Sequence, residues 1–104
     1  MDIEVLHIDE CPGWEPALMR LREALQSRGH DDIIVTEKAL RSEPEAGATG
    51  FAGSPTIVVD GIDLSPSDGR TASLACRVYR SERGFAPSPT TEQIAEALRA
   101  RIAG

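Results

Sequence analysis

The chain has 104 residues, of which 40% are hydrophobic and 27% charged, a composition typical of one globular domain and not of a disordered protein. The 17 acidic and 11 basic residues give a net charge of −6, which argues against nucleic acid or an anionic membrane as a partner. No basic leader precedes the first apolar pattern, and no apolar run approaches the ~20 residues of a membrane span. The chain length predicts a single domain over residues 1–104. Only two cysteines, Cys11 and Cys76, are present, so we expect a reducing cytoplasm and no dense disulfide framework.

The first half of the chain predicts a strand, a helix and a second strand. Residues 3–8 (IEVLHI) carry apolar side chains on both alternating faces, as in a strand that is covered on both sides. A cysteine and a proline follow, and proline is favoured at the first position of a helix. Leucines at helical spacing and Gly29 at the end then predict a helix over residues 12–28, and residues 32–36 (DIIVT) predict a strand.

The middle of the chain predicts a hairpin. Residues 42–49 are small and polar and have only weak helical potential. Residues 56–59 (TIVV) have strong strand preference, and Asp60-Gly61 is among the best two-residue hairpin signals. We therefore expect residues 62–64 to return antiparallel to that strand.

The last third is less regular until its final helix. Residues 65–89 are rich in serine, proline and glycine, and residues 72–80 (ASLACRVYR) fit either a helical turn or a short extended piece. Thr90 and Gln93 have the spacing of a capping box, and apolar residues at helical spacing follow them. The sequence therefore ends in a helix.

This order of elements predicts an α/β fold. The strand, helix and strand of the first half require a right-handed crossover between parallel strands. The hairpin and the final helix of the second half add antiparallel strands and a covering layer. We expect a mixed sheet of about four strands with helices on both faces.

Four stretches of the chain resemble a known family: CPGW at residues 11–14, GSPT at 53–56, ACRVY at 75–79 and SPTTEQ at 88–93. The order of elements resembles the thioredoxin-like fold in its short, glutaredoxin-like form. The chain is also similar to small bacterial thioredoxin-like proteins that carry a CPxW motif and are sometimes labelled as related to alkylmercury lyase. The resemblance covers nearly the whole chain, and its motifs are more specific for the fold than for a reaction.

The resemblance implies where the chemistry lies. Cys11 stands where the family has its redox motif, and Ser54-Pro55-Thr56 resembles the segment that holds a cis-proline, so we expect a cis peptide bond before Pro55. In that fold the two segments meet across the strand ends. Trp14 occupies the place of the second cysteine of a dithiol motif, so the remaining chemistry is one-thiol chemistry at Cys11 or uses a distant partner.

Cys11 is the candidate nucleophile. A thiol at the start of a helix faces unpaired N–H groups and the positive end of the helix dipole, which can lower its pKa from ~8.5 by one or more units. Asp9 and Glu10 act in the opposite direction, because neighbouring negative charge raises the pKa of a thiol. Pro12 and Trp14 would adjoin the sulfur, with the indole as a shelter or a flat wall for a ligand. The alternative is that Cys11 is a small, inert core residue.

The segment around Pro55 is the candidate docking edge. The backbone N–H and C=O groups of Ser54 and Thr56 would be turned toward Cys11. They would hold an extended substrate, such as a low-molecular-weight thiol or a peptide, by hydrogen bonds like those of a strand. The alternative is an ordinary trans proline at the first residue of a strand.

Cys76 has three interpretations. It is an inert buried cysteine, a resolving thiol that attacks a mixed disulfide at Cys11, or a soft ligand that binds mercury together with Cys11. A disulfide between the two requires Cα atoms within ~7 Å. Arg77 and Arg80 flank this cysteine and would either lower its pKa, bind an anion or simply face solvent.

Three functions are compatible with these residues. The first is a monothiol-type thiol–disulfide oxidoreductase that acts on a low-molecular-weight thiol or a protein disulfide. The second is a non-catalytic binding module that keeps the scaffold, and the third is a protein that handles thiophilic metals or organomercurials. The sequence has no zinc-like spacing of histidine and cysteine and no phosphate-binding loop, so we expect no cofactor and no resident metal. The sequence does not indicate which oligomeric state the protein has.

Overall fold

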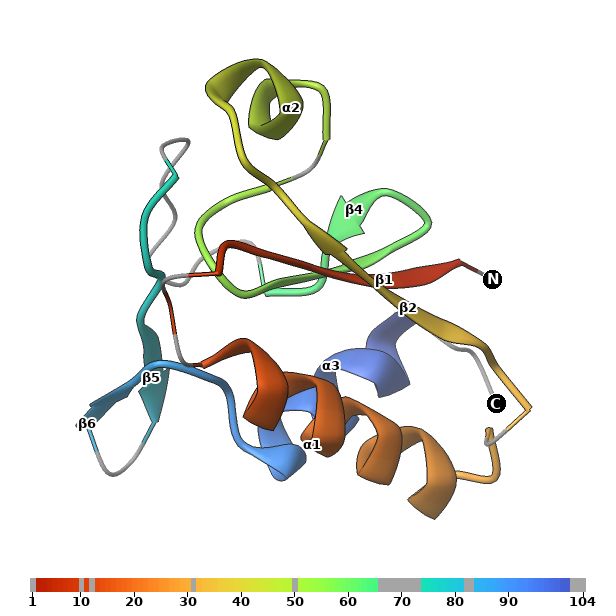
Figure 1. Cartoon of the computed structure of the whole chain (residues 1–104). Coiled ribbons are helices and arrows are strands. Elements are labelled where there is room, and N and C mark those ends of the chain that lie inside the picture. The colour runs from red at the N-terminus through yellow and green to blue at the C-terminus, as the bar shows by residue number, and fades with distance from the viewer. Residues whose placement is uncertain are drawn as a thin grey trace.

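A four-stranded mixed sheet lies between helices on both of its faces (Figure 1). The computed structural model describes residues 2–9, 11, 13–30, 32–49, 51–65, 74–81 and 84–101. The elements, in chain order, are β1 (Ile3–His7), α1 (Trp14–Ser27), β2 (Val35–Ala39), α2 (Glu43–Gly47), β3 (Thr56–Val59), β4 (Ile62–Asp63), β5 (Tyr79–Ser81), β6 (Gly84–Ala86) and α3 (Thr91–Arg101). The α/β class, the mixed sheet of four strands and the helices on both faces agree with the sequence analysis.

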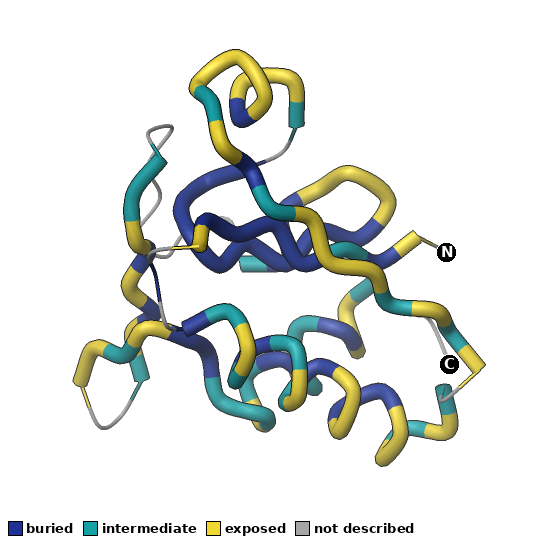
Figure 2. Tube along the Cα trace, in the orientation of Figure 1, coloured by how far each residue is buried: buried dark blue, intermediate teal, exposed yellow. Residues whose placement is uncertain are grey.

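The sheet has the strand order β2-β1-β3-β4. β1 runs parallel to β2 through the crossover that contains α1, and it runs antiparallel to β3, which in turn is antiparallel to β4. The predicted hairpin turn is confirmed: Asp60 and Gly61 have φ values of 52° and 81°, as a tight turn between such strands requires. The two inner strands, β1 and β3, are largely buried (Figure 2).

Two hydrophobic clusters lie on opposite faces of the sheet. The first joins Ile3 and Val5 of β1 and residues of β3 to the buried faces of α1 and α3, which lie side by side below the sheet in Figure 1. The second contains Leu6 of β1, Val58 of β3, a buried alanine of α2 and Cys11. The alternation along β1 therefore supplies both cores, and the candidate nucleophile belongs to the second one.

The end of α1 and the start of α3 follow their sequence signals, whereas α1 begins at Trp14, two residues later than predicted. At the end of α1, the N–H groups of Gly29 and His30 donate to the carbonyl oxygens of Gln26 and Leu25, and Gly29 has a φ of 76°. This is a glycine-terminated helix end in which otherwise unpaired carbonyl groups are satisfied.

The capping box before α3 is also present. The Gln93 N–H donates to the Thr90 hydroxyl and the Thr90 N–H donates to the Gln93 side chain, each at 3.0 Å. Ile94 and Leu98 are buried on the predicted face. Ile102, which the pattern also placed on that face, lies outside the described residues.

The second strand lies further along the chain than predicted. Residues 32–36 form it only in part, because pairing with β1 begins at Val35 and continues to Ala39. Ile33 packs against the core from the turn that precedes β2, whereas Ile34 is exposed. The apolar residues that predicted a strand at residues 32–36 thus include Ile33, which contacts the core from outside the strand. The strand itself carries exposed polar side chains because it lies at the edge of the sheet.

The segment before β5 is extended in its described part. Cys76 makes an isolated parallel bridge with Ser54, and β5 and β6 then form a hairpin that the sequence analysis did not predict. Of the two alternatives for residues 72–80, the described part takes the extended one from Cys76 onward, after bends at residues 74 and 75. Within the described parts of the chain, no helix has the length and apolar character needed to cross a membrane.

Gly13 provides a test of how closely Pro87 packs against the start of α1. It precedes α1 and is buried, and a Cβ atom there would lie 2.8 Å from the carbonyl carbon of Pro87 and closer still to its oxygen. We expect Gly13→Ala to lower the free energy of unfolding by about 1–3 kcal/mol, because backbone must move to admit the methyl group. Urea unfolding measures this change.

Gly47, the last residue of α2, is the matched control. A Cβ there meets nothing within 4 Å, so Gly47→Ala should leave stability unchanged or raise it by up to about 1 kcal/mol. Equal losses in the two variants would contradict the close approach of Pro87 to the start of α1.

Candidate functional site

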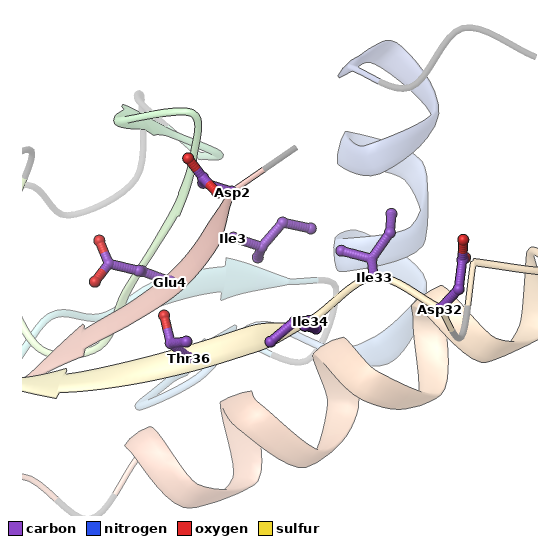
Figure 3. A pocket seen from close by; sticks show the side chains of 7 residues that line it. All are labelled: Asp2, Ile3, Glu4, Asp32, Ile33, Ile34 and Thr36. Carbon is purple, nitrogen blue, oxygen red and sulfur yellow. The ribbon is translucent and has the colours of Figure 1, made fainter.

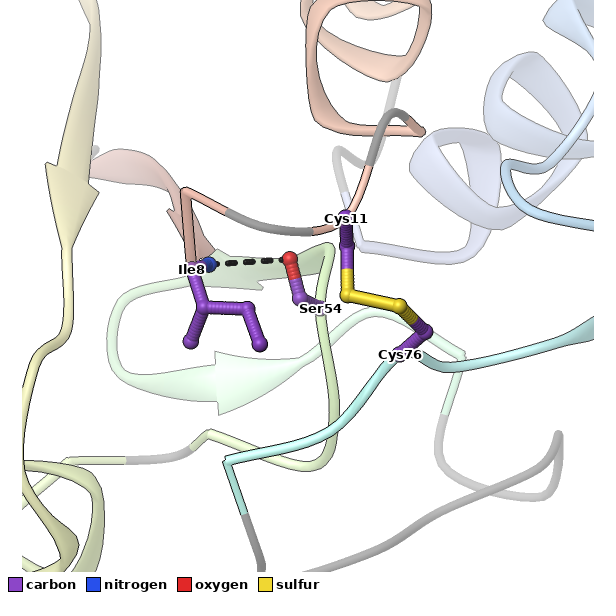
Figure 4. Close-up of a disulfide and its surroundings, with 4 residues drawn as sticks. All are labelled: Ile8, Cys11, Ser54 and Cys76. Carbon is purple, nitrogen blue, oxygen red and sulfur yellow. Dashed lines mark hydrogen bonds between the residues drawn. A yellow bond between two sulfur atoms is a disulfide. The ribbon is translucent and has the colours of Figure 1, made fainter.

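A disulfide joins Cys11 to Cys76, which are separated by 65 positions in the sequence (Figure 4). Their Cα atoms are 5.6 Å apart, within the range that a disulfide requires. The structure therefore brings together the two residues that were expected to carry the chemistry. It also shows the pair in its oxidised form.

The two cysteines have different surroundings. Cys11 follows β1 and precedes α1, and only 2% of its surface is exposed, because it is part of the second hydrophobic cluster. Cys76 lies on the extended segment before β5 and is exposed. One cysteine thus belongs to the core and the other to the surface.

Ser54 is the residue against which the Cys76 segment is aligned. Its N–H donates to the carbonyl oxygen of Ala75 and its carbonyl accepts from the N–H of Arg77, both at 2.8 Å. Its hydroxyl accepts from the N–H of Ile8 at 3.0 Å (Figure 4). All the polar groups of Ser54 are therefore used within the chain, and the backbone edge expected to hold a substrate is occupied by residues 75–77.

The neighbours of Ser54 are buried as well. The peptide bond between Ser54 and Pro55 is cis, as predicted. Thr56 begins β3, and its hydroxyl donates to the carbonyl of Gly53 and accepts from the N–H of Ala52. Pro55 and Thr56 are both buried, so in this oxidised form they offer no open surface to a ligand.

Arg77 anchors the segment that carries Cys76. Its side chain is completely buried, and Nη1 lies 3.1 and 3.2 Å from the two carboxylate oxygens of Asp63, which is itself 5% exposed. Nη2 donates to the carbonyl of Ser65. Arg77 therefore does not face solvent beside Cys76, contrary to the solvent-facing interpretation.

Tyr79 makes a second anchor on the same side of the segment. Its hydroxyl donates to the carbonyl oxygen of Pro55, and its ring lies 4.8 Å below the guanidinium carbon of Arg77. Tyr79 and Asp63 were not predicted as site-forming residues, and Arg77 was considered only as a charged neighbour of Cys76. The only available signal was the alternation of Cys76, Arg77, Val78 and Tyr79, which does not say what each face meets.

Trp14 lies in the first turn of α1 and stacks on His7 at the end of β1. The two rings are 4.0 Å apart and 8° from parallel, and His7 Nε2 contacts the carboxylate of Glu37. The indole is therefore held against the sheet by the imidazole. Pro12, which was expected to adjoin the sulfur, lies outside the described residues.

A shallow hollow opens at the other end of β1 (Figure 3). Its lining consists of Asp2, Ile3, Glu4, Asp32, Ile33, Ile34 and Thr36. It lies at the start of β1, whereas Cys11 follows the end of that strand, so it is separate from the disulfide. Among the described residues, no three His, Cys, Asp or Glu side chains gather as a metal site.

Compared with protein-family models, with curated proteins and with solved structures, the chain has no match. The function is therefore inferred from the residues and their geometry. The features available for that inference are the disulfide, the different exposure of its two cysteines and the anchored segment on which one of them lies.

The buried ion pair predicts a large effect on stability. We expect Asp63→Asn to lower the free energy of unfolding by about 3 kcal/mol, because Arg77 would keep its charge in a site without the compensating carboxylate. Thermal or urea unfolding of the oxidised protein measures the loss.

The same substitution at Asp9 is the matched control. Asp9 pairs with Arg41 at 3.3 Å, but both side chains are more than half exposed, so Asp9→Asn should cost no more than about 1 kcal/mol. Similar losses in the two variants would show that the Arg77–Asp63 pair does not hold the Cys76 segment.

Proposed function

We propose that the protein is a thioredoxin-like thiol–disulfide oxidoreductase whose redox couple is Cys11 and Cys76. The strand order β2-β1-β3-β4, with parallel and antiparallel pairs, supports the fold assignment together with the position of Cys11 between β1 and α1. The observation that carries the function is the disulfide itself, which closes between a cysteine next to a helix start and an exposed cysteine.

The proposed cycle has two exchange steps. In the reduced protein, the Cys11 thiolate attacks a sulfur of the substrate disulfide, and the other substrate sulfur leaves as a thiolate. The Cys76 thiolate then attacks the Cys11 sulfur and releases the second substrate thiol. The substrate gains two electrons, and the protein loses two and closes the bond that joins Cys11 to Cys76.

The placement of the two cysteines supports such a cycle. The bridge between Ser54 and Cys76 and the buried Arg77 side chain fix the Cys76 backbone beside Cys11 by contacts other than the disulfide. Two thiols held within bridging distance react at a high effective concentration. The partners remain those of the sequence analysis, a low-molecular-weight thiol or a protein disulfide.

The compartment bears on how the disulfide is interpreted. In a reducing cytoplasm, which the two-cysteine content predicts, disulfides of mesophilic proteins are usually transient, catalytic or redox-sensing. That expectation favours a redox couple over a permanent cross-link.

A non-catalytic binding module is the second candidate. The observation that favours it is the occupied edge at Ser54, because both backbone groups that would hold an extended substrate are bonded to Ala75 and Arg77. In that case the disulfide is a structural cross-link. The proposal for thiophilic metals requires the reduced pair, in which both sulfurs are available as ligands.

A redox titration separates these candidates. We expect the Cys11–Cys76 pair to equilibrate with glutathione or thioredoxin redox buffers at a potential between about −180 and −280 mV, as in oxidoreductases. Cys11→Ser and Cys76→Ser should each abolish formation of the intramolecular bond and the thiol-dependent reduction of a small disulfide. A pair that stays oxidised below about −300 mV, with both serine variants retaining activity, would identify a structural cross-link.

A further inference from the structure

The two cysteines of the disulfide differ in their exposure to solvent. Cys11 is 2% exposed and packs in the cluster that contains Leu6, Phe51 and Val58, whereas Cys76 is exposed. Thiol–disulfide exchange requires the attacking thiolate to approach one sulfur directly, so access decides which sulfur is attacked. In the oxidised protein, the open approach is to Cys76.

The anchored strand explains why Cys76 is the exposed member of the pair in the oxidised protein. Along the extended segment, Arg77 and Tyr79 point inward and are buried, while Cys76, Val78 and Arg80 alternate with them and are exposed. Ser54 pairs with the backbone on both sides of Cys76. A rotation that buried Cys76 would have to expose the Arg77 guanidinium and break its contacts with Asp63.

The other sulfur is suited to leave. Cys11 lies three residues before Trp14, the first residue of α1, and the positive end of the dipole of this 14-residue helix would stabilise a thiolate there. A better stabilised thiolate leaves faster in disulfide exchange. Burial of Cys11 in the apolar cluster opposes this stabilisation, so access to Cys76 is the observation that sets the direction of bond cleavage.

We propose that reduction of the protein begins at Cys76 and passes through a mixed disulfide on that residue. This inference rests on the proposed function and adds the point at which the reductant enters. A reductant thiolate attacks Cys76 Sγ, a new S–S bond forms, and the electron pair of the Cys11–Cys76 bond leaves on Cys11 Sγ, which then takes a proton from solvent. A second reductant thiol attacks the reductant sulfur of the mixed disulfide and releases Cys76 as a thiolate together with the oxidised reductant.

The two half-reactions thus use different sulfurs. A substrate disulfide is exchanged at Cys11, and the reductant is exchanged at Cys76. In the oxidised protein Cys11 is buried, so a released substrate thiol finds no direct approach to the sulfur that it left. Oxidation of the protein by the substrate disulfide is therefore favoured over the reverse reaction.

Mapping of the adduct with glutathione tests the proposal. The oxidised full-length protein is mixed with reduced glutathione under native conditions, quenched in acid at a series of times and digested with trypsin. Cleavage at arginine places Cys11 in the peptide of residues 1–20 and Cys76 in that of residues 71–77. We expect glutathione on the second peptide and a free thiol on the first.

The other outcomes are distinct. Glutathione on residues 1–20, or equally on both peptides, overturns the entry at Cys76 but leaves the proposed redox function intact. A bond that opens only after the protein has been unfolded in urea overturns the proposed function itself.

Charge variants give a second measurement that does not need the intermediate to accumulate. Val78 is exposed and lies two residues from Cys76 on the same side of an extended segment. Because glutathione is anionic, it should reduce the disulfide of the Val78→Arg variant about five-fold faster than that of the Val78→Glu variant at low salt. The difference should shrink in 1 M salt.

Ile62 is the matched control. It is exposed on β4, and its partner is Val59, at the end of β3 that lies away from Ser54. Glutathione should reduce the disulfides of the Ile62→Arg and Ile62→Glu variants at equal rates. Equal rates for the two Val78 variants would overturn the assignment of Cys76 as the entry point.

Discussion

The pairing of Ser54 with residues 75–77 is the constraint on which the candidate site depends. Two backbone hydrogen bonds of 2.8 Å hold this segment beside the sheet. They place Cys76 next to Cys11 although 65 positions separate the two in the chain. Bringing such distant residues together carries an entropic cost, and backbone pairing together with the buried Arg77 offsets it before the sulfurs react.

The same segment explains the asymmetry of the disulfide. An extended chain presents alternate residues to opposite sides, so anchoring Arg77 and Tyr79 in the interior leaves Cys76 outside. Cys11 is buried for a different reason, because it follows β1 and packs with the cluster on that face of the sheet. The proposed direction of reduction follows from these two independent features of the fold.

The occupied edge at Ser54 bears on both proposed functions. In a redox cycle, residues 75–77 take the backbone positions that an extended substrate would otherwise use, so the oxidised protein has no free docking edge there. In a binding module, the same contacts are permanent structure. The two interpretations share one geometry and differ in whether the bond between Cys11 and Cys76 opens under native conditions.

The sequence alone determined the α/β class through the order of its elements, and the hairpin at Asp60-Gly61 and the capping box at Thr90 through local signals. The cis bond before Pro55 was predicted only through a family resemblance. It singled out Cys11 and Cys76 without deciding whether they meet. The tertiary structure decided that, because their proximity depends on long-range pairing with Ser54 and on the ion pair of Arg77 with Asp63. Side-chain alternation shows that an arginine and a cysteine face opposite ways, but only the packed chain decides which of the two is buried.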